Sequence, residues 1–98
     1  MWQIYVFSFL SGAFAANGTP HFVKGVTGQK NQTPFGKGSS AIVNVCWGWA
    51  NLVAAVVFLH FAHPHTHLYR AFAIFAIGAL LKGLGSANQW SKHPEYNK

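Results

Sequence analysis

Long runs of apolar residues dominate the chain and predict its helices. Residues 41–62, AIVNVCWGWANLVAAVVFLHFA, contain no Asp, Glu, Lys or Arg, and residues 68–88, LYRAFAIFAIGALLKGLGSAN, form a second run. Each run is about 20 residues long, which at about 1.5 Å per residue matches the roughly 30 Å hydrocarbon core of a bilayer. Trp or Tyr lies near an end of each run, as is typical of membrane interfaces. Both segments are therefore predicted to be transmembrane helices.

A third apolar run, at about residues 2–18, is shorter and ends in the sequence NGTP. No Lys or Arg precedes Lys24, so the run lacks the basic region of a secretory signal peptide. It predicts a first span that is short, tilted or broken. Thr19 is expected to cap a separate short helix at the interface, with Pro20 in its first turn.

Together these patterns predict an all-α membrane protein with three transmembrane helices in a single domain, residues 1–98. A polar loop at about residues 25–40 joins the first two helices, and a histidine-rich turn at residues 63–67 joins the last two. The composition agrees, because charged residues make up 8% of the chain against about 25% in ordinary soluble proteins. Glu95 is the only acidic residue, so catalysis by paired carboxylates is excluded and no enzymatic activity is predicted.

The distribution of positive charge predicts an orientation. The chain has a formal net charge of +6, but its basic residues are dispersed and do not form the patch typical of nucleic-acid binding. Three spans place Arg70 and the N-terminus on one side. Five lysines fall on the other side: Lys24, Lys30, Lys37, Lys92 and Lys98. The positive-inside rule makes the lysine-rich side cytoplasmic, in contact with anionic lipids, and places the N-terminus and the histidine turn outside.

One face of the second span carries polar and small residues, namely Asn44, Trp47, Gly48 and Asn51. Asn side chains in hydrocarbon need hydrogen-bond partners, and small residues let helices approach closely. The third span repeats the pattern with Gly78, Lys82, Gly85 and Ser86. We predict that these two faces form a helix-packing seam, within one chain or between copies.

A polar pathway lined by Asn44, Asn51 and Lys82 is the alternative to a packing seam. A lysine inside a membrane span is a functional candidate. Lys82 lies only about six residues from the inner end of its span, however, so its long side chain could also reach the headgroups.

The turn between the last two spans contains four of the six histidines: His60, His63, His65 and His67. Imidazole suits Zn, Cu and Ni, so a transition-metal site is one interpretation of this spacing. The other is a polar interfacial turn, because neutral histidines also fit at headgroup level. No acidic ligand lies nearby and Arg70 opposes a cation, so no cofactor is predicted.

The chain resembles a family of uncharacterised small bacterial multi-span inner-membrane proteins. The similar sequence is NGTPHFVKGVTGQKNQTPFG, followed by SSAIVNVCWGWANLV, which covers roughly the first half and the second span. The resemblance implies a location in the bacterial inner membrane. It implies no activity and assigns no functional residue.

Three classes of function follow from these features. The first is a non-enzymatic structural or accessory subunit that self-associates or docks onto a larger membrane complex. The second is a homo-oligomeric transporter or channel, for an anion or a neutral solute because no carboxylate lies in a span. The third is a metal-binding membrane protein that uses the histidine turn.

Overall fold

The computed structural model describes residues 2–91, with side chains through residue 88. Its elements are α1 (Trp2–Val26), the short strands β1 (Asn31–Thr33) and β2 (Gly36–Ser39), α2 (Ala41–Ala62), a 3-10 turn η1 (Pro64–Thr66) and α3 (Leu68–Ser91). The fold is thus mostly helical with three long helices, as the apolar runs predicted.

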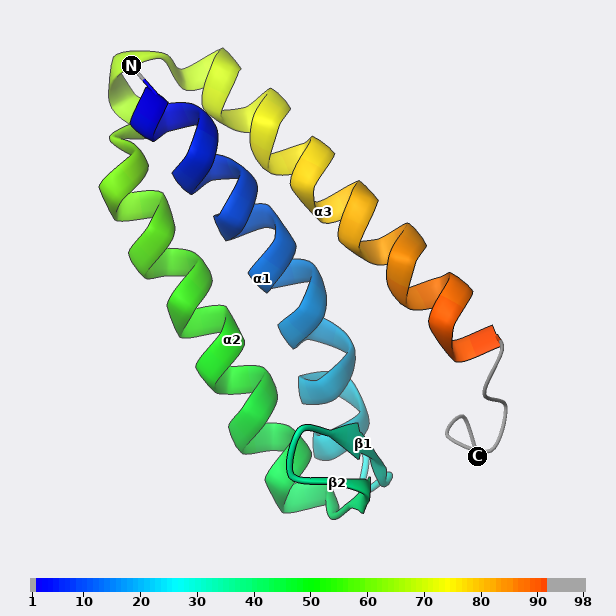
Figure 1. Ribbon diagram of the computed structural model, residues 1–98. Helices are drawn as coiled ribbons and strands as arrows, with labels where there is room; N and C mark the ends of the chain where they lie inside the picture. The colour runs from blue at the N-terminus through cyan, green and yellow to red at the C-terminus, as the bar shows by residue number, and fades with distance from the viewer. Residues whose placement is uncertain (1, 92–98) are drawn as a thin grey trace.

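The first helix, α1, lies between the other two (Figure 1). It packs extensively against both α2 and α3, whereas no substantial contact joins α2 to α3 in the described chain. The start of α1 and the turn η1 lie at one end of the molecule, and the strands lie at the other end with the last turns of α3 (Figure 1). We call these the turn end and the hairpin end.

The first helix does not break at NGTP, contrary to the sequence-based expectation. It runs without interruption for 25 residues, with Pro20 inside it. Thr19 caps nothing, because its hydroxyl instead donates to the carbonyl of Ala15 at 2.7 Å. Pro20 removes one backbone donor, but Asn17 and His21 on either side of it are each hydrogen-bonded to α2. These tertiary bonds hold the helix together beyond the proline.

A small antiparallel hairpin replaces part of the polar loop expected at residues 25–40. Strand β1 pairs with β2 through Asn31–Ser39 and Thr33–Gly36. The hydroxyls of Thr33 and Ser39 lie 2.6 Å apart and share a hydrogen bond, while Ser39 also donates to the Gly36 carbonyl at 2.9 Å. The hairpin thus has its own polar core, and it lies next to the first turn of α2.

Capping residues define both ends of α2. Ser40 precedes the helix, and its hydroxyl accepts a hydrogen bond from the amide of Val43. His63 follows the helix in the left-handed conformation, with φ of 51°, and Pro64 comes next. A left-handed residue followed by proline is a common helix end, so α2 ends at the residue that the sequence predicted.

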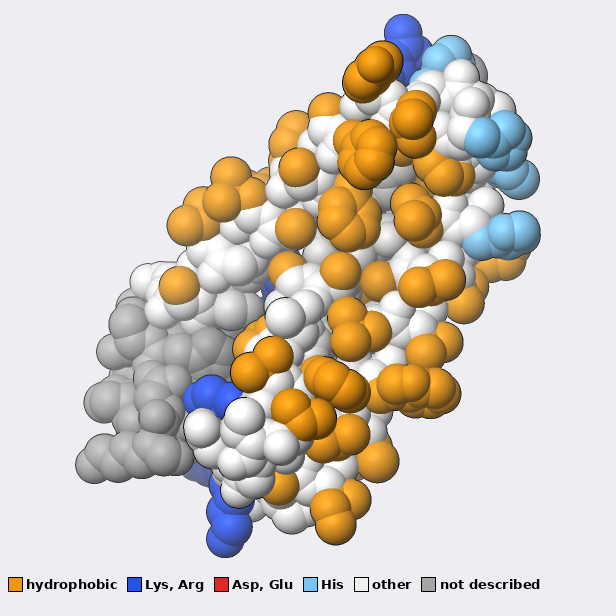
Figure 2. Space-filling view, turned by 180° about the vertical axis from the view of Figure 1, so that it is seen from behind, with side chains coloured by type: hydrophobic (Ala, Val, Ile, Leu, Met, Phe, Trp, Pro, Cys, Tyr) orange, Lys and Arg blue, Asp and Glu red, His pale blue; other side chains and the backbone are white. Residues whose placement is uncertain are grey.

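The interior is polar and the surface is apolar. Ser8, Ser11 and Asn44 are the largest side chains that are almost completely buried, while Ile42 remains 76% exposed and Leu80 61% exposed. Hydrophobic side chains cover the face shown in Figure 2, and histidines gather at the turn end. Two helical segments in the described chain, Ala41–Ala62 and Leu68–Asn88, are long and apolar enough to cross a membrane.

Candidate functional site

Small residues bring α1 and α2 into backbone contact. A Cβ atom added to Gly18 would lie 2.7 Å from the carbonyl oxygen of Gly48, and one added to Gly25 would lie 2.6 Å from the amide of Val45. A Cβ on Gly48 would collide with the backbone of Phe22. Close approach of this kind requires glycine at the crossing positions. The face of α2 that contains Gly48 therefore lies directly on α1.

Asn44 is the most completely bonded side chain in this contact. It is fully buried, and its amide nitrogen donates to the carbonyls of Asn31, Ser39 and Ser40 at 3.0–3.1 Å. Its amide oxygen lies 2.9 Å from Nδ1 of His21. One residue of α2 thus joins the hairpin, the start of its own helix and α1.

The bonds of Asn44 also determine the tautomer of His21. Three carbonyl acceptors require the amide nitrogen of Asn44 on their side, which leaves only its oxygen facing His21. An oxygen can only accept, so Nδ1 of His21 carries the proton. The neutral ring therefore presents Nε2 as an acceptor, and a protonated ring presents it as a donor.

A second polar link lies deeper along the same contact. The amide of Asn17 donates to the side-chain oxygen of Asn51 at 3.0 Å, and Asn51 in turn donates to the carbonyl of Trp47 at 2.8 Å. Further towards the turn end, the hydroxyl of Ser11 donates to the carbonyl of Ala55 at 2.6 Å. We call the residues that these hydrogen bonds join across α1 and α2 the polar seam.

The contact between α1 and α3 is tight in the middle and open near the hairpin end. Cβ atoms added to Gly12 or Gly78 would collide with the backbone of Phe75 or Phe9, respectively. By contrast, no described atom lies within 4 Å of a Cβ on Gly85. Gly85 therefore lies on the predicted face but packs against nothing in residues 2–91, because α3 diverges from α1 below the crossing point (Figure 1).

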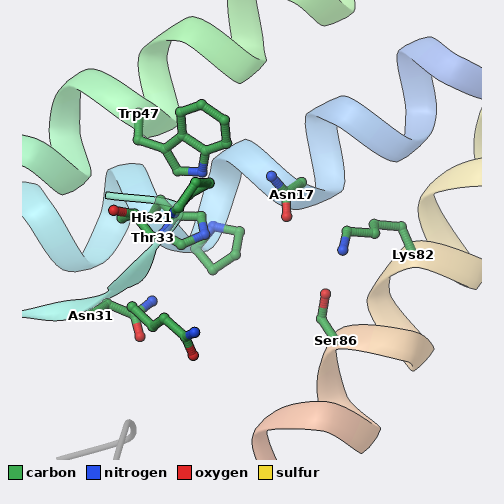
Figure 3. A pocket seen from close by; sticks show the side chains of 10 residues that line it. Asn17, His21, Asn31, Thr33, Trp47, Lys82 and Ser86 are labelled. Carbon is green, nitrogen blue, oxygen red and sulfur yellow. The ribbon is translucent and has the colours of Figure 1, made fainter. Parts of the chain in front are cut away.

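This divergence leaves a cavity of about 270 Å³ between α1, the hairpin and α3. Lys82 and Ser86 point into it from α3, towards Asn17 and His21 on α1 (Figure 3). The rest of the lining consists of Pro20, Asn31, Gln32, Thr33, Pro34 and Trp47. Of the predicted site residues, Lys82 and Trp47 therefore line a cavity, whereas Asn44 and Gly48 lie in the helix contact. Asn51 belongs to the seam and also lines a smaller adjoining cavity with Lys82.

Two acceptors in the hairpin wall of the cavity lack partners. Asn31 is 5% exposed, and neither its side-chain oxygen nor that of Gln32 has a hydrogen-bond partner in the described chain. Buried polar atoms without partners are uncommon, because each costs about 1–3 kcal/mol. The cavity thus combines a cationic side with an acceptor-rich side.

Three of the four histidine rings of the turn lie in a row. The ring centroids of His60 and His63 lie 6.3 Å apart, and those of His63 and His65 lie 6.0 Å apart. His67 is half-buried at the start of α3. Within residues 2–91, no group of three or more His, Cys, Asp or Glu side chains is arranged to hold a metal ion. Metal binding at this turn stays a prediction from sequence.

Replacing His63, His65 and His67 together with Ala is expected to change the free energy of unfolding by only about 1 kcal/mol, because these side chains are exposed or half-buried. Thermal unfolding of the purified variant measures this, and elemental analysis of tag-free parent protein is its companion. Near-stoichiometric Zn, Cu or Ni in the parent, absent from the variant, would show that the turn is a metal site.

Asn17 and His21 were not predicted as site residues. A signal for them was present in α1, where most of the buried residues recur at intervals of three and four: Ile4, Ser8, Ser11, Gly12, Gly18, His21 and Gly25. This is the spacing of a helix-packing face, and it matches the spacing of Asn44, Gly48, Asn51 and Ala55 on α2. Pro20, which lies between Asn17 and His21, predicted a break in the helix, so the continuous packing face was not recognised from the sequence.

No protein-family model, curated protein or solved structure matches this chain.

Proposed function

We propose that this chain is a small integral membrane protein that serves as a structural or accessory subunit, either self-associating or docked onto a larger membrane complex. The observation that carries the proposal is the reversed distribution of polarity. Asn44 and Asn51 are buried at 0% and 3% exposure, while Val56 on the same helix is 67% exposed.

A bilayer accounts for this distribution, and water does not. Soluble monomers rarely expose large continuous apolar surfaces, but lipid tails solvate such side chains directly. Buried hydrogen bonds between Asn, Ser and His suit helix association in lipid, where apolar burial supplies little driving force. The polar seam of α1 and α2 fits this role.

The proposed orientation in a bacterial inner membrane follows from charge. Lys24 at the end of α1 and Lys30 and Lys37 around the hairpin lie at one end, whereas Arg70 lies at the start of α3, near the turn end. The positive-inside rule then places the hairpin in the cytoplasm.

Cysteine labelling tests the membrane location and the orientation together. Cys46 is an exposed free thiol, so the background for this experiment is Cys46→Ser. Thr66→Cys at the turn end is expected to react with a membrane-impermeant maleimide in intact cells, whereas Gly38→Cys in the hairpin reacts only after the membrane is permeabilised. Equal labelling of both sites in intact cells would exclude a membrane-crossing arrangement, and the opposite pattern would reverse the orientation.

A face of α3 supports the proposed association. Gly83 and Ala87 lie four residues apart on this face, and no described atom lies within 4 Å of a Cβ on Gly83. Small residues at this spacing let helices from separate chains approach closely in lipid. The exposed surface of α3 around this face carries large apolar side chains, among them Leu80, Leu81 and Leu84.

Gly83→Leu is therefore expected to leave the fold intact and to weaken association about tenfold, which corresponds to about 1.4 kcal/mol. The leucine side chain would block the close approach of the two helices and remove their van der Waals contacts. Native mass spectrometry after gentle extraction reports the copies and the bound subunits. Ala50→Leu adds a side chain to an exposed position of α2 and is the matched control. If the parent is a lone monomer, or if both variants associate as it does, the proposed face is wrong.

A further inference from the structure

We propose that the cavity between α1, the hairpin and α3 binds a phosphate ester that also carries hydroxyl groups, such as a phosphoglycerol. The phosphate lies against Lys82, and the hydroxyls donate to the hairpin wall. This binding site goes beyond the accessory role and does not depend on it.

The charge of Lys82 is the first argument. Lys82 is half-buried and points into the cavity (Figure 3). Residues 2–91 contain no Asp or Glu, since Glu95 is the only acidic residue of the chain. A cation removed from water is costly unless a counter-charge lies close to it. A bound anion supplies that charge.

Additional donors next to Lys82 favour phosphate over a simple halide. The Ser86 hydroxyl points into the same space, and the indole nitrogen of Trp47 lies on the side of its ring that faces the cavity (Figure 3). The Nδ1 proton of His21 is committed to Asn44, so Nε2 of the neutral ring is an acceptor for a hydroxyl group of the ligand and not a donor to its phosphate. Phosphate oxygens accept several hydrogen bonds at once, and bonds to charged groups are among the strongest in proteins.

The opposite wall selects for hydroxyl groups. The side-chain oxygens of Asn31 and Gln32 are buried and lack a donor in the described chain. Phosphate alone does not satisfy both, because an ionised phosphate is mainly an acceptor. Both oxygens are enclosed in this conformation, so the two amides turn towards the cavity when hydroxyl groups of the ligand donate to them. The two walls together therefore match an anionic phosphate linked to a short polyol.

Such a group reaches the cavity either as a soluble ester or as the headgroup of an anionic lipid. Glycerol 3-phosphate and phosphatidylglycerol are the two probes. Glycerol 3-phosphate is titrated by calorimetry into the protein in phosphatidylcholine nanodiscs. Retention of phosphatidylglycerol, with phosphatidic acid as the hydroxyl-free comparison, is measured by native mass spectrometry. The soluble titration repeated in detergent separates failure of this site from failure of the membrane assignment.

Lys82→Met is expected to weaken binding of the preferred probe by at least about tenfold, and Lys82→Arg to retain most of it. Lys37→Met removes the same charge from an exposed hairpin position outside the cavity, and it is expected to bind as the parent does. Gln32→Met is expected to lower the preference for phosphatidylglycerol over phosphatidic acid about threefold, because it removes one acceptor.

Several results would overturn the proposal. Equal losses in Lys82→Met and Lys37→Met would show diffuse attraction without a site. Tighter binding in Glu95→Gln would show that the chain supplies its own counter-charge to Lys82. Absence of binding by both probes would also refute the site. Binding of the soluble ester alone, or of the lipid alone, supports the shared chemistry and identifies the source.

Discussion

Gly48→Leu is expected to separate α1 from α2 and to destabilise the protein by about 3 kcal/mol or more, at the upper end of overpacking effects. A Cβ at this position would collide with the backbone of Phe22 and would lie 2.7 Å from the carbonyl oxygen of Gly18. These neighbours are backbone atoms of a helix, so they cannot move aside as a side chain does. The helices must therefore shift apart, which breaks the polar seam.

Val56→Leu is the control for that experiment, because Val56 lies on the same helix and is 67% exposed. It is expected to unfold as the parent does in a denaturant titration followed by circular dichroism. Similar stabilities for Gly48→Leu and Val56→Leu would mean that α1 and α2 do not cross at Gly48.

Asn44→Ala is expected to cost about 3–5 kcal/mol, since it leaves several buried groups without partners at about 1–3 kcal/mol each. The substitution removes a bond from the carbonyls of Asn31, Ser39 and Ser40 and from Nδ1 of His21, although the Ser40 carbonyl keeps its bond to the backbone amide of residue 44. Because two of these carbonyls belong to the hairpin, the loss should appear first there. Hydrogen exchange of residues 27–40 is expected to accelerate before the helices unfold.

Asn17→Ala provides the comparison, because Asn17 makes one side-chain bond, to Asn51. Its expected cost is about 1 kcal/mol, and the hairpin should keep its protection. If Asn44→Ala were no more damaging than Asn17→Ala, the four bonds to Asn44 would not hold the hairpin in place.

The sequence predicted α2 and α3 well because their signals are local. Each of these two helices follows from one continuous apolar run and depends on no distant residue. The shared face of Asn44, Gly48 and Asn51 also follows from helical periodicity alone, and that face is the one that lies on α1.

The features that the sequence did not predict depend on contacts between distant residues. Pro20 and the residues before it are local breaking signals, but the bonds from Asn17 and His21 to α2 outweigh them. The hairpin depends on Asn44, whose side-chain amide donates to the carbonyl of Asn31, 13 residues earlier in the chain. The packing of Gly78 and the open space at Gly85 are set by the angle between two helices, which periodicity does not encode.

The central place of α1 has a consequence for the order of assembly during synthesis. Of these three helices, α1 is synthesised first, and both α2 and α3 pack against it. The polar face of α1 lacks its partners until α2 has been made. The pair α1–α2, joined by the hairpin, makes the hydrogen bonds of the polar seam without α3. Helix α3 then adds to a finished surface through its crossing at Gly78 and makes no substantial contact with α2. It is consequently the segment that can detach at the lowest free-energy cost, so an open form with α3 released and the pair intact should precede global unfolding.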